Sequence, residues 1–167
     1  MPDFPHDVYL DANTVLHFLM ETPEKHEILD QLFLGTQRPT FWTSTVSIVE
    51  VAYFAQTAGL PSINQGLSQI EHFWAERHVT LIEPTQQAME MGRDFMRACV
   101  EAKRTNTQNS IRNRSIDAVH LGCARWVKAQ ELWTFDTKLI DLGPYSPNVI
   151  IREPWLEAPP LFDITNL

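Results

Sequence analysis

The chain has 167 residues, 44% hydrophobic and 20% charged, so it is long enough to bury a core and should form one globular domain. Thirteen Lys and Arg against 21 Asp and Glu give a formal net charge of −8, which excludes a uniformly basic nucleic-acid clamp. No apolar run approaches the ~20 residues of a membrane-spanning helix, and residues 1–7 do not resemble a signal peptide. We therefore expect a cytoplasmic protein, with Cys99 and Cys123 as buried thiols.

In chain order, short β-branched or aromatic runs alternate with longer segments of helical character. We expect strands at 7–10, 40–43, 79–82, 131–135 and 148–151. We expect helices at about 12–20, 24–34, 46–58, 62–76, 85–104 and 115–129, with a short helix after Asp136. Strands that alternate with helices predict an α/β domain whose parallel sheet is covered on both faces.

Four acidic residues fall at positions typical of an active site. Asp11 and Asp136 each follow a predicted strand, at the edge where parallel sheets bind ligands. Asp117 lies in the first turn of a predicted helix, and Glu50 lies inside an apolar helical run. Each acid also has a purely structural interpretation: Asp11 and Asp136 as helix N-caps, Ser47 with Glu50 as a capping box, and Asp117 as a charge favoured by the helix dipole.

Glu50 has apolar neighbours on every side, so we expect most of its helix to be buried. A buried carboxylate needs a partner, and no basic residue lies within one helical turn of Glu50. Three acids at one edge of the sheet, together with Glu50 in its apolar helix, would repel one another unless a cation is bound. Oxygen ligands without a Cys or His motif favour Mg²⁺ or Mn²⁺, ions that commonly serve phosphate chemistry.

Four short blocks around these acids resemble, in the same order, the motifs of PIN-domain nucleases. The blocks are VYLDANTVL at 8–16, TSTVSIVEV at 43–51, SIDAVHLGCA at 115–124 and LWTFDTKL at 132–139. They span most of the chain, and each contains its acid. The size of the domain is most similar to that of VapC-type toxins of toxin–antitoxin pairs.

The resemblance implies a three-layer α/β/α sandwich with a five-stranded parallel sheet. It also implies a Mg²⁺- or Mn²⁺-dependent endoribonuclease, with Asp11, Glu50, Asp117 and Asp136 around the metal. Asn13 and Thr134 fall where such proteins often carry supporting polar residues. Toxins of this type are usually homodimers that a cognate antitoxin holds inactive by inserting near the acids. Metal-dependent hydrolysis of the RNA phosphodiester would leave a 5′-phosphate on the product.

The chain also departs from the family pattern. His120, one helical turn after Asp117, is interpreted as a core histidine or, alternatively, as a partner for a carboxylate. Residues 97–114 carry five Lys and Arg and one Glu, a net charge of +4, and include a polar stretch from Thr105. This segment is either a solvated loop or a lip that grips substrate phosphates. Its candidate RNA contacts are Arg104, Arg112 and Arg114.

We expect the whole chain to divide into a PIN-like nuclease domain at 1–152 and a proline-rich C-terminal extension at 153–167. The apolar residues of the extension suggest that it lies on its own domain or, alternatively, binds a partner. Two other functions stay open. An aspartyl-phosphate phosphatase would need a second Asp where Asn13 stands, and a PIN-like module could bind RNA or protein without cutting.

Overall fold

The computed structural model describes residues 4–20, 24–35, 38–57, 63–76, 79–105 and 115–156. Its strands form one five-stranded sheet in the order β3-β2-β1-β4-β5, in which every neighbouring pair is parallel. The strands are β1 (Asp7–Leu10), β2 (Thr40–Ser44), β3 (Val79–Ile82), β4 (Glu131–Trp133) and β5 (Ile150–Arg152). All five lie within two residues of the positions predicted from sequence, and the parallel sheet is confirmed.

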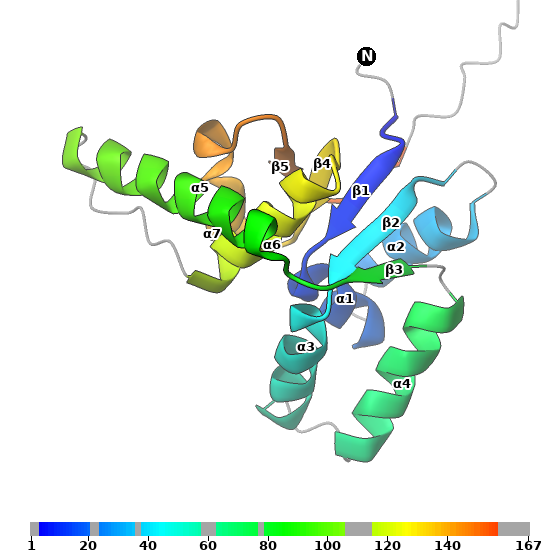
Figure 1. Cartoon of the computed structure of the whole chain (residues 1–167). Helices are drawn as coiled ribbons and strands as arrows, with labels where there is room; N and C mark the ends of the chain where they lie inside the picture. Colours follow the sequence, from blue (N-terminus) through cyan, green and yellow to red (C-terminus); the bar gives the residue numbers. More distant parts are fainter. Residues whose placement is uncertain are drawn as a thin grey trace, which may run out of the picture.

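Seven helices and one 3₁₀ turn surround the sheet in the described residues. They are α1 (Ala12–Leu19), α2 (Lys25–Leu34), α3 (Val46–Thr57), α4 (Ile63–Glu76), α5 (Gln86–Thr105), α6 (Ser115–Trp126), α7 (Thr137–Ile140) and η1 (Gly143–Tyr145). Figure 1 shows α1 to α4 on one side of the sheet, and α5 and α6 on the other. The three-layer α/β/α sandwich is therefore confirmed.

Each face of the sheet carries its own hydrophobic core. Along β1, Val8 and Leu10 face one layer and pack with residues such as Phe33 of α2, whereas Tyr9 faces the other and packs with Leu121 of α6. This alternation is the two-residue period of a strand. Because both faces are covered, Val8, Tyr9 and Leu10 are 0% exposed, and the first residue after β1, Asp11, is held at the carboxyl edge of the sheet.

Helices α5 and α6 approach each other closely through two glycines. A Cβ atom added to Gly92 would collide with the backbone oxygen of Ala118, and one added to Gly122 would collide with that of Ala88. This close packing fixes the position of α6, which begins at the carboxyl edge and runs back toward β4. The first two turns of α6 carry Asp117 and His120 to that edge.

The end of α6 and the start of β5 lie at other residues than predicted, because the backbone turns there. Helix α6 ends at Trp126 instead of 129, because Lys128 adopts a φ of 59° and the Ala129 N–H bonds back to Ala124. Strand β5 begins at Ile150, after Asn148 with a φ of 66°. A positive φ is incompatible with a regular helix or strand, and the residue types alone did not reveal it.

The expected burial of α3 holds on one side of the helix only. Val49, Tyr53 and Phe54 are exposed by 69%, 62% and 43%. Helix α3 packs against α1, α4 and the sheet on one side only, so its opposite side faces solvent although its residues are apolar. The helix thus combines a buried apolar side with an exposed one.

The start of the C-terminal extension lies on the domain. The indole nitrogen of Trp155 donates to the buried carboxylate of Glu131 at 3.0 Å, and its ring packs against Phe4. Residues 157–167 lie outside the described part, so the proposed boundary after residue 152 stays a prediction. Among the described helices, none combines the length and apolarity that a bilayer crossing requires.

Candidate functional site

The site begins with Asp11, the residue after β1. Its backbone N–H continues the ladder to β4 by donating to Trp133 at 3.1 Å. Its side chain is nearly buried, and Oδ2 accepts a 2.8 Å hydrogen bond from the Thr134 hydroxyl. Burial raises the pKa of Asp11, although His120 and Thr134 oppose the shift. Asp11 is the N-cap of α1 by position, but its carboxylate makes no capping hydrogen bond, so the capping interpretation does not explain the side chain.

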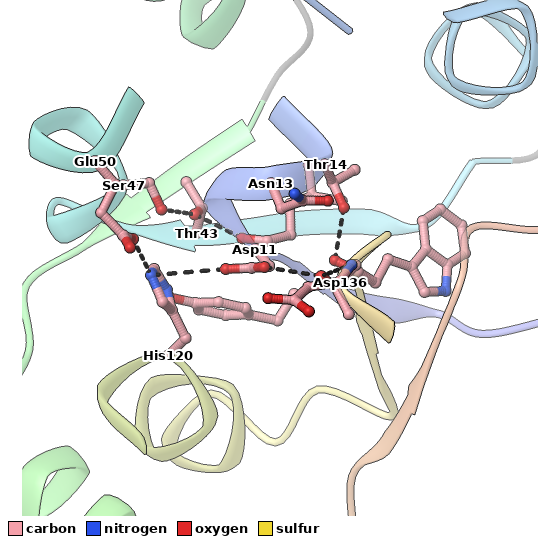
Figure 2. Close-up of polar contacts among 12 residues, drawn as sticks. Asp11, Asn13, Thr14, Thr43, Ser47, Glu50, His120 and Asp136 are labelled. Carbon is pink, nitrogen blue, oxygen red and sulfur yellow. Dashed lines mark hydrogen bonds and ion pairs between the residues drawn. The ribbon is translucent and has the colours of Figure 1, made fainter. Parts of the chain in front are cut away.

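Glu50 and His120 meet in front of Asp11. The Nε2 atom of His120 lies 2.5 Å from Oε2 of Glu50 and 3.7 Å from Oδ1 of Asp11 (Figure 2). His120 is buried, whereas the Glu50 side chain is 21% exposed. Among the described residues, no Lys or Arg lies within ion-pair distance of either carboxylate. The partner that Glu50 was expected to need is therefore His120, which is 70 residues away in the chain.

The imidazole of His120 is fixed from its other side by Tyr9. The Tyr9 hydroxyl and Nδ1 of His120 share a 2.9 Å hydrogen bond in the core. Burial disfavours the charged imidazole, but the hydrogen bond to Glu50 and the charges of Asp11, Glu50 and Asp117 outweigh it and raise the pKa of His120. Both interpretations of His120 that the sequence allowed therefore hold. It is a buried histidine, and it is also the partner of a carboxylate.

Asp136 joins the site through Thr134. The Asp136 N–H donates to the Thr134 hydroxyl at 3.0 Å, and that hydroxyl donates to Asp11. The Asp136 carboxylate accepts the backbone N–H of Lys138 at 2.9 Å, so its interpretation as an N-cap is confirmed for α7. Figure 2 shows Asp136 beside Asp11 at the end of the sheet.

Asp117 stands in the first turn of α6, half-buried, and its charge acts on His120. Three residues in the described part bring their ligand atoms within 4.8 Å of one another: Asp11, Glu50 and His120. Asp117 and Asp136 are not members of this compact group. Their predicted role as metal ligands stays a prediction.

Buried hydroxyl and amide groups hold the loops that carry the acids. Asn13 accepts the backbone N–H of Phe135 at 3.1 Å and thereby fixes the loop before Asp136. Thr43 donates to the Leu10 carbonyl and contacts the Ser47 hydroxyl at 2.7 Å. The alternative interpretation of Ser47 and Glu50 as a capping box is wrong, because Ser47 bonds to Thr43 and Glu50 to His120.

A lysine stands next to the acidic edge. Lys25, the first residue of α2, donates to Nε2 of His17 at 3.1 Å and lies 4.6 Å from the ring centre of Phe135. Burial and the nearby ammonium lower the pKa of His17, so its neutral ring accepts this hydrogen bond. No carboxylate of the described residues lies within ion-pair distance of Lys25. Its charge thus lies over the ring of Phe135, the residue that precedes Asp136 in the chain.

The predicted RNA contacts cannot be placed in the same way. Arg104 belongs to the last turn of α5, but its side chain lies outside the described part, as do Arg112 and Arg114 entirely. Sequence reasoning missed Lys25 and His17, and it left His120 out of the site. A histidine one turn after Asp117 was the visible signal for His120; no comparable pattern marked Lys25.

The donor set suits a divalent ion. Asp11 and Glu50 offer carboxylate oxygens, the preferred ligands of Mg²⁺ and Mn²⁺. Asp11 is buried and its pKa is raised, so a cation beside it would relieve the cost of its charge. The three donor atoms within 4.8 Å are close enough for one ion to contact all of them with small movements.

Comparison with known proteins agrees with the fold. The PIN domain profile matches residues 8–143, and no curated protein matches the chain in sequence. A chain of the Rickettsia felis VapBC2 complex bound to promoter DNA has a TM-score of 0.62 at 16% identity, over 90% of this chain and 99% of its own. A chain of the DNA-bound Salmonella typhimurium VapBC gives 0.63 at 19%, over 89% and 98%.

A third solved structure is described as a toxin that cleaves the sarcin–ricin loop. This Mycobacterium tuberculosis VapC20 has a TM-score of 0.58 at 14% identity, over 81% of this chain and 95% of its own. At such identities the three structures establish the fold, while the profile match covers more than half of the sequence. The chain belongs to the PIN domain family.

Proposed function

We propose that this protein is a metal-dependent endoribonuclease that hydrolyses RNA phosphodiesters, and that it is the toxin of a toxin–antitoxin pair. The observation that carries the proposal is the meeting of Asp11 and Glu50 at the carboxyl edge of the sheet, with no Lys or Arg of the described residues to neutralise them. In the metal-free protein the buried imidazole of His120 offsets these two charges, and a divalent cation bound there would take over that role. The place of this pair after β1 is where parallel sheets bind their ligands.

In the proposed reaction, Asp11 and Glu50 hold the ion, and Asp117 and Asp136 complete its surroundings. When bound, Mg²⁺ or Mn²⁺ would supply charge stabilisation for the phosphodiester and ease loss of a proton from the attacking water. Glu50 or Asp117 would accept that proton. Thr134 keeps Asp11 oriented through its 2.8 Å hydrogen bond. The expected products carry a 5′-phosphate.

Binding of RNA by a chain with a net charge of −8 requires local cations. We infer that Lys25 contacts a phosphate of the substrate, because it packs on Phe135, the residue before Asp136, and the neutral ring of His17 leaves its charge intact. Arg104, Arg112 and Arg114 stay as predicted further contacts. With so few contacts, we expect modest affinity for RNA in general, and selection of substrate by its shape.

The toxin role draws on the VapBC complexes among the similar folds and on the surface beside the site. Val49, Tyr53 and Phe54 form an exposed apolar surface of α3 around Glu50. Apolar surface next to a charged site fits a protein partner. We infer that a cognate antitoxin covers this surface and the acids, and that the active toxin is a cytoplasmic homodimer.

The first experiment is cleavage of a labelled total-RNA pool by the wild type and by Asp11→Asn, each with Mn²⁺ and with EDTA. Asp94→Asn, an exposed residue of α5, is the matched control. Discrete 5′-phosphate products from the wild type and the control alone, abolished by EDTA, would support the nuclease. Equal cleavage by Asp11→Asn would contradict the site, and circular dichroism checks that this variant folds.

The alternative is a PIN-like module that binds RNA or protein without cutting. RNA binding by the wild type without cleavage under any metal condition would favour it. Thermal unfolding separates the two further, because a working metal site gives a Mn²⁺-dependent rise in melting temperature that Asp11→Asn reduces.

The toxin role has its own test in cells. Induction of the wild-type chain should arrest growth, Asp11→Asn should not, and co-expression of a small neighbouring reading frame should restore growth. Growth arrest that persists with Asp11→Asn would contradict a toxin that acts through this site.

A further inference from the structure

We propose that His120 contributes its Nε2 atom as a direct ligand to the metal ion, which makes the centre a mixed Asp11–Glu50–His120 site with a preference for Mn²⁺ over Mg²⁺. The inference rests on the proposed metal-dependent function and extends it to a nitrogen ligand. It differs from the sequence-based expectation, in which four carboxylates alone surround the ion.

The position of Nε2 is the first observation. It lies between the two carboxylates that are the best-placed oxygen ligands, 2.5 Å from Glu50 and 3.7 Å from Asp11. All three donor atoms fall within 4.8 Å of one another. Bonds of roughly 2.1 Å place two ligands of one ion up to about 4.2 Å apart. The spread of up to 4.8 Å is slightly larger than this, so small side-chain movements would bring Nε2 onto an ion that contacts Asp11 and Glu50.

The orientation of the ring is the second observation. A histidine that ligates through one nitrogen almost always donates the N–H of the other nitrogen to a fixed acceptor. Here Nδ1 faces the Tyr9 hydroxyl at 2.9 Å. The phenol oxygen of Tyr9 can accept a hydrogen bond from Nδ1–H. With Nδ1–H bonded in this way, Nε2 is the nitrogen that faces the carboxylates, and its electron pair becomes available to an ion once its own hydrogen leaves.

Burial makes this arrangement rigid. Tyr9 and His120 are 0% and 1% exposed, and they belong to a strand and a helix that are packed in the core. In the metal-free protein a hydrogen lies between Nε2 and Glu50. The ion takes its place, the hydrogen leaves to solvent as a proton, and Nδ1–H stays bonded to Tyr9.

A nitrogen ligand changes which ion the site prefers. Mg²⁺ is a hard ion that favours oxygen ligands and keeps several waters, whereas imidazole binds transition-metal ions more readily. Asp11 and Glu50 alone would suit both ions. The addition of His120 should shift the balance toward Mn²⁺.

The test uses the full chain loaded with Mn²⁺ and electron spin echo modulation, which detects nitrogen bound directly to the ion. We expect ¹⁴N coupling from one imidazole in the wild type and in His72→Gln, an exposed-histidine control on α4. The coupling should be absent in His120→Gln. Replacing all histidines with ¹⁵N-histidine should convert the signal to that of ¹⁵N, which tests the ligand without any variant.

Affinity gives a second readout. His120→Gln should weaken Mn²⁺ binding by about 10–100-fold, and Mg²⁺ binding by clearly less, as measured by calorimetry. Tyr9→Phe should retain the ¹⁴N coupling but weaken Mn²⁺ binding, because Nδ1–H loses its acceptor.

The outcomes separate this inference from the proposed function. Bound Mn²⁺ without ¹⁴N coupling, or coupling that persists in His120→Gln, would overturn the ligand role and leave the nuclease proposal intact. Equal loss of Mn²⁺ and Mg²⁺ affinity in His120→Gln would overturn the preference. A wild-type protein that binds no Mn²⁺ would overturn both.

Discussion

His120 and Glu50 are 70 residues apart, yet Nε2 of the imidazole lies 2.5 Å from the carboxylate in a part of the core that contains no Lys or Arg ion-pair partner among the described residues. His120 supplies the positive partner that Glu50 was expected to need, since the neighbours of Glu50 in the chain are apolar. Glu50 is thereby held facing Asp11 instead of turning to solvent, even though its neighbours Val49 and Phe54 are exposed.

Replacement of Glu50 by Gln tests this relationship. The change keeps the size of the side chain but removes one charge and the proposed proton acceptor, so we expect cleavage to fall by about 10²–10⁴-fold. Glu90→Gln, an exposed residue of α5, is the matched control and should retain activity. The readout is the cleavage rate at saturating Mn²⁺, and near-wild-type cleavage by Glu50→Gln would show that Glu50 is dispensable.

The pKa of His120 predicts how stability depends on pH. The folded protein raises this pKa above the unfolded value of about 6.5. The contribution of protonated His120 to the free energy of unfolding is therefore complete below pH about 6.5 and is lost as pH rises through the raised folded value. Urea unfolding of metal-free wild type and His120→Gln should differ most at the acidic end of this range.

Val119→Ala provides a non-titrating comparison in the same helix. Its difference from the wild type should stay constant over that pH range. A His120→Gln difference that grows as pH rises would have the wrong sign and would contradict the buried ion pair.

The sequence was sufficient for the fold because its signals were local and repeated. Alternation of short strand runs with helical segments predicted the parallel sheet, and the acids after β1 and β4 predicted the edge that carries the site. Contacts between distant residues were harder to predict. His120 looked like a core residue because nothing near it in the chain shows that Glu50 will face it.

The same limit explains why the sequence predicted neither the contact of Lys25 with Phe135 nor the exposed side of α3. Lys25 reaches Phe135 only after α2 folds back from the carboxyl edge, and no motif encodes this meeting. An apolar helix predicts burial, but burial also depends on which neighbours cover it, and α3 has neighbours on one side only. Exposed Tyr53 therefore could not be predicted from composition.

Close packing of α5 on α6 should make Gly122 intolerant of a side chain. Gly122→Ala places a Cβ atom against the backbone oxygen of Ala88, which cannot move aside cheaply, so we expect a loss of about 1–3 kcal/mol or more in the free energy of unfolding. Gly143→Ala is the control, because the nearest atom to its Cβ is 3.9 Å away. Equal stability of the two variants would contradict the close approach of the helices.

Lys25→Gln tests the proposed phosphate contact. The variant keeps a polar side chain near His17 but removes the charge over the ring of Phe135. We expect weaker RNA binding, a higher KM with an almost unchanged kcat, and a salt dependence of binding whose slope is reduced by about 1. The readouts are RNA binding by Asp11→Asn with and without Lys25→Gln, over a series of salt concentrations, and the cleavage kinetics of the single Lys25→Gln variant.

Lys128→Gln is the matched control, because Lys128 lies between α6 and β4, at the opposite edge of the sheet. The total charge changes equally in both variants, so a general electrostatic effect would weaken binding equally. If Lys25 contacts a phosphate directly, Lys25→Gln should weaken RNA binding more than Lys128→Gln does. An unaltered salt slope in Lys25→Gln would instead assign the phosphate contacts to the basic segment that contains Arg104, Arg112 and Arg114.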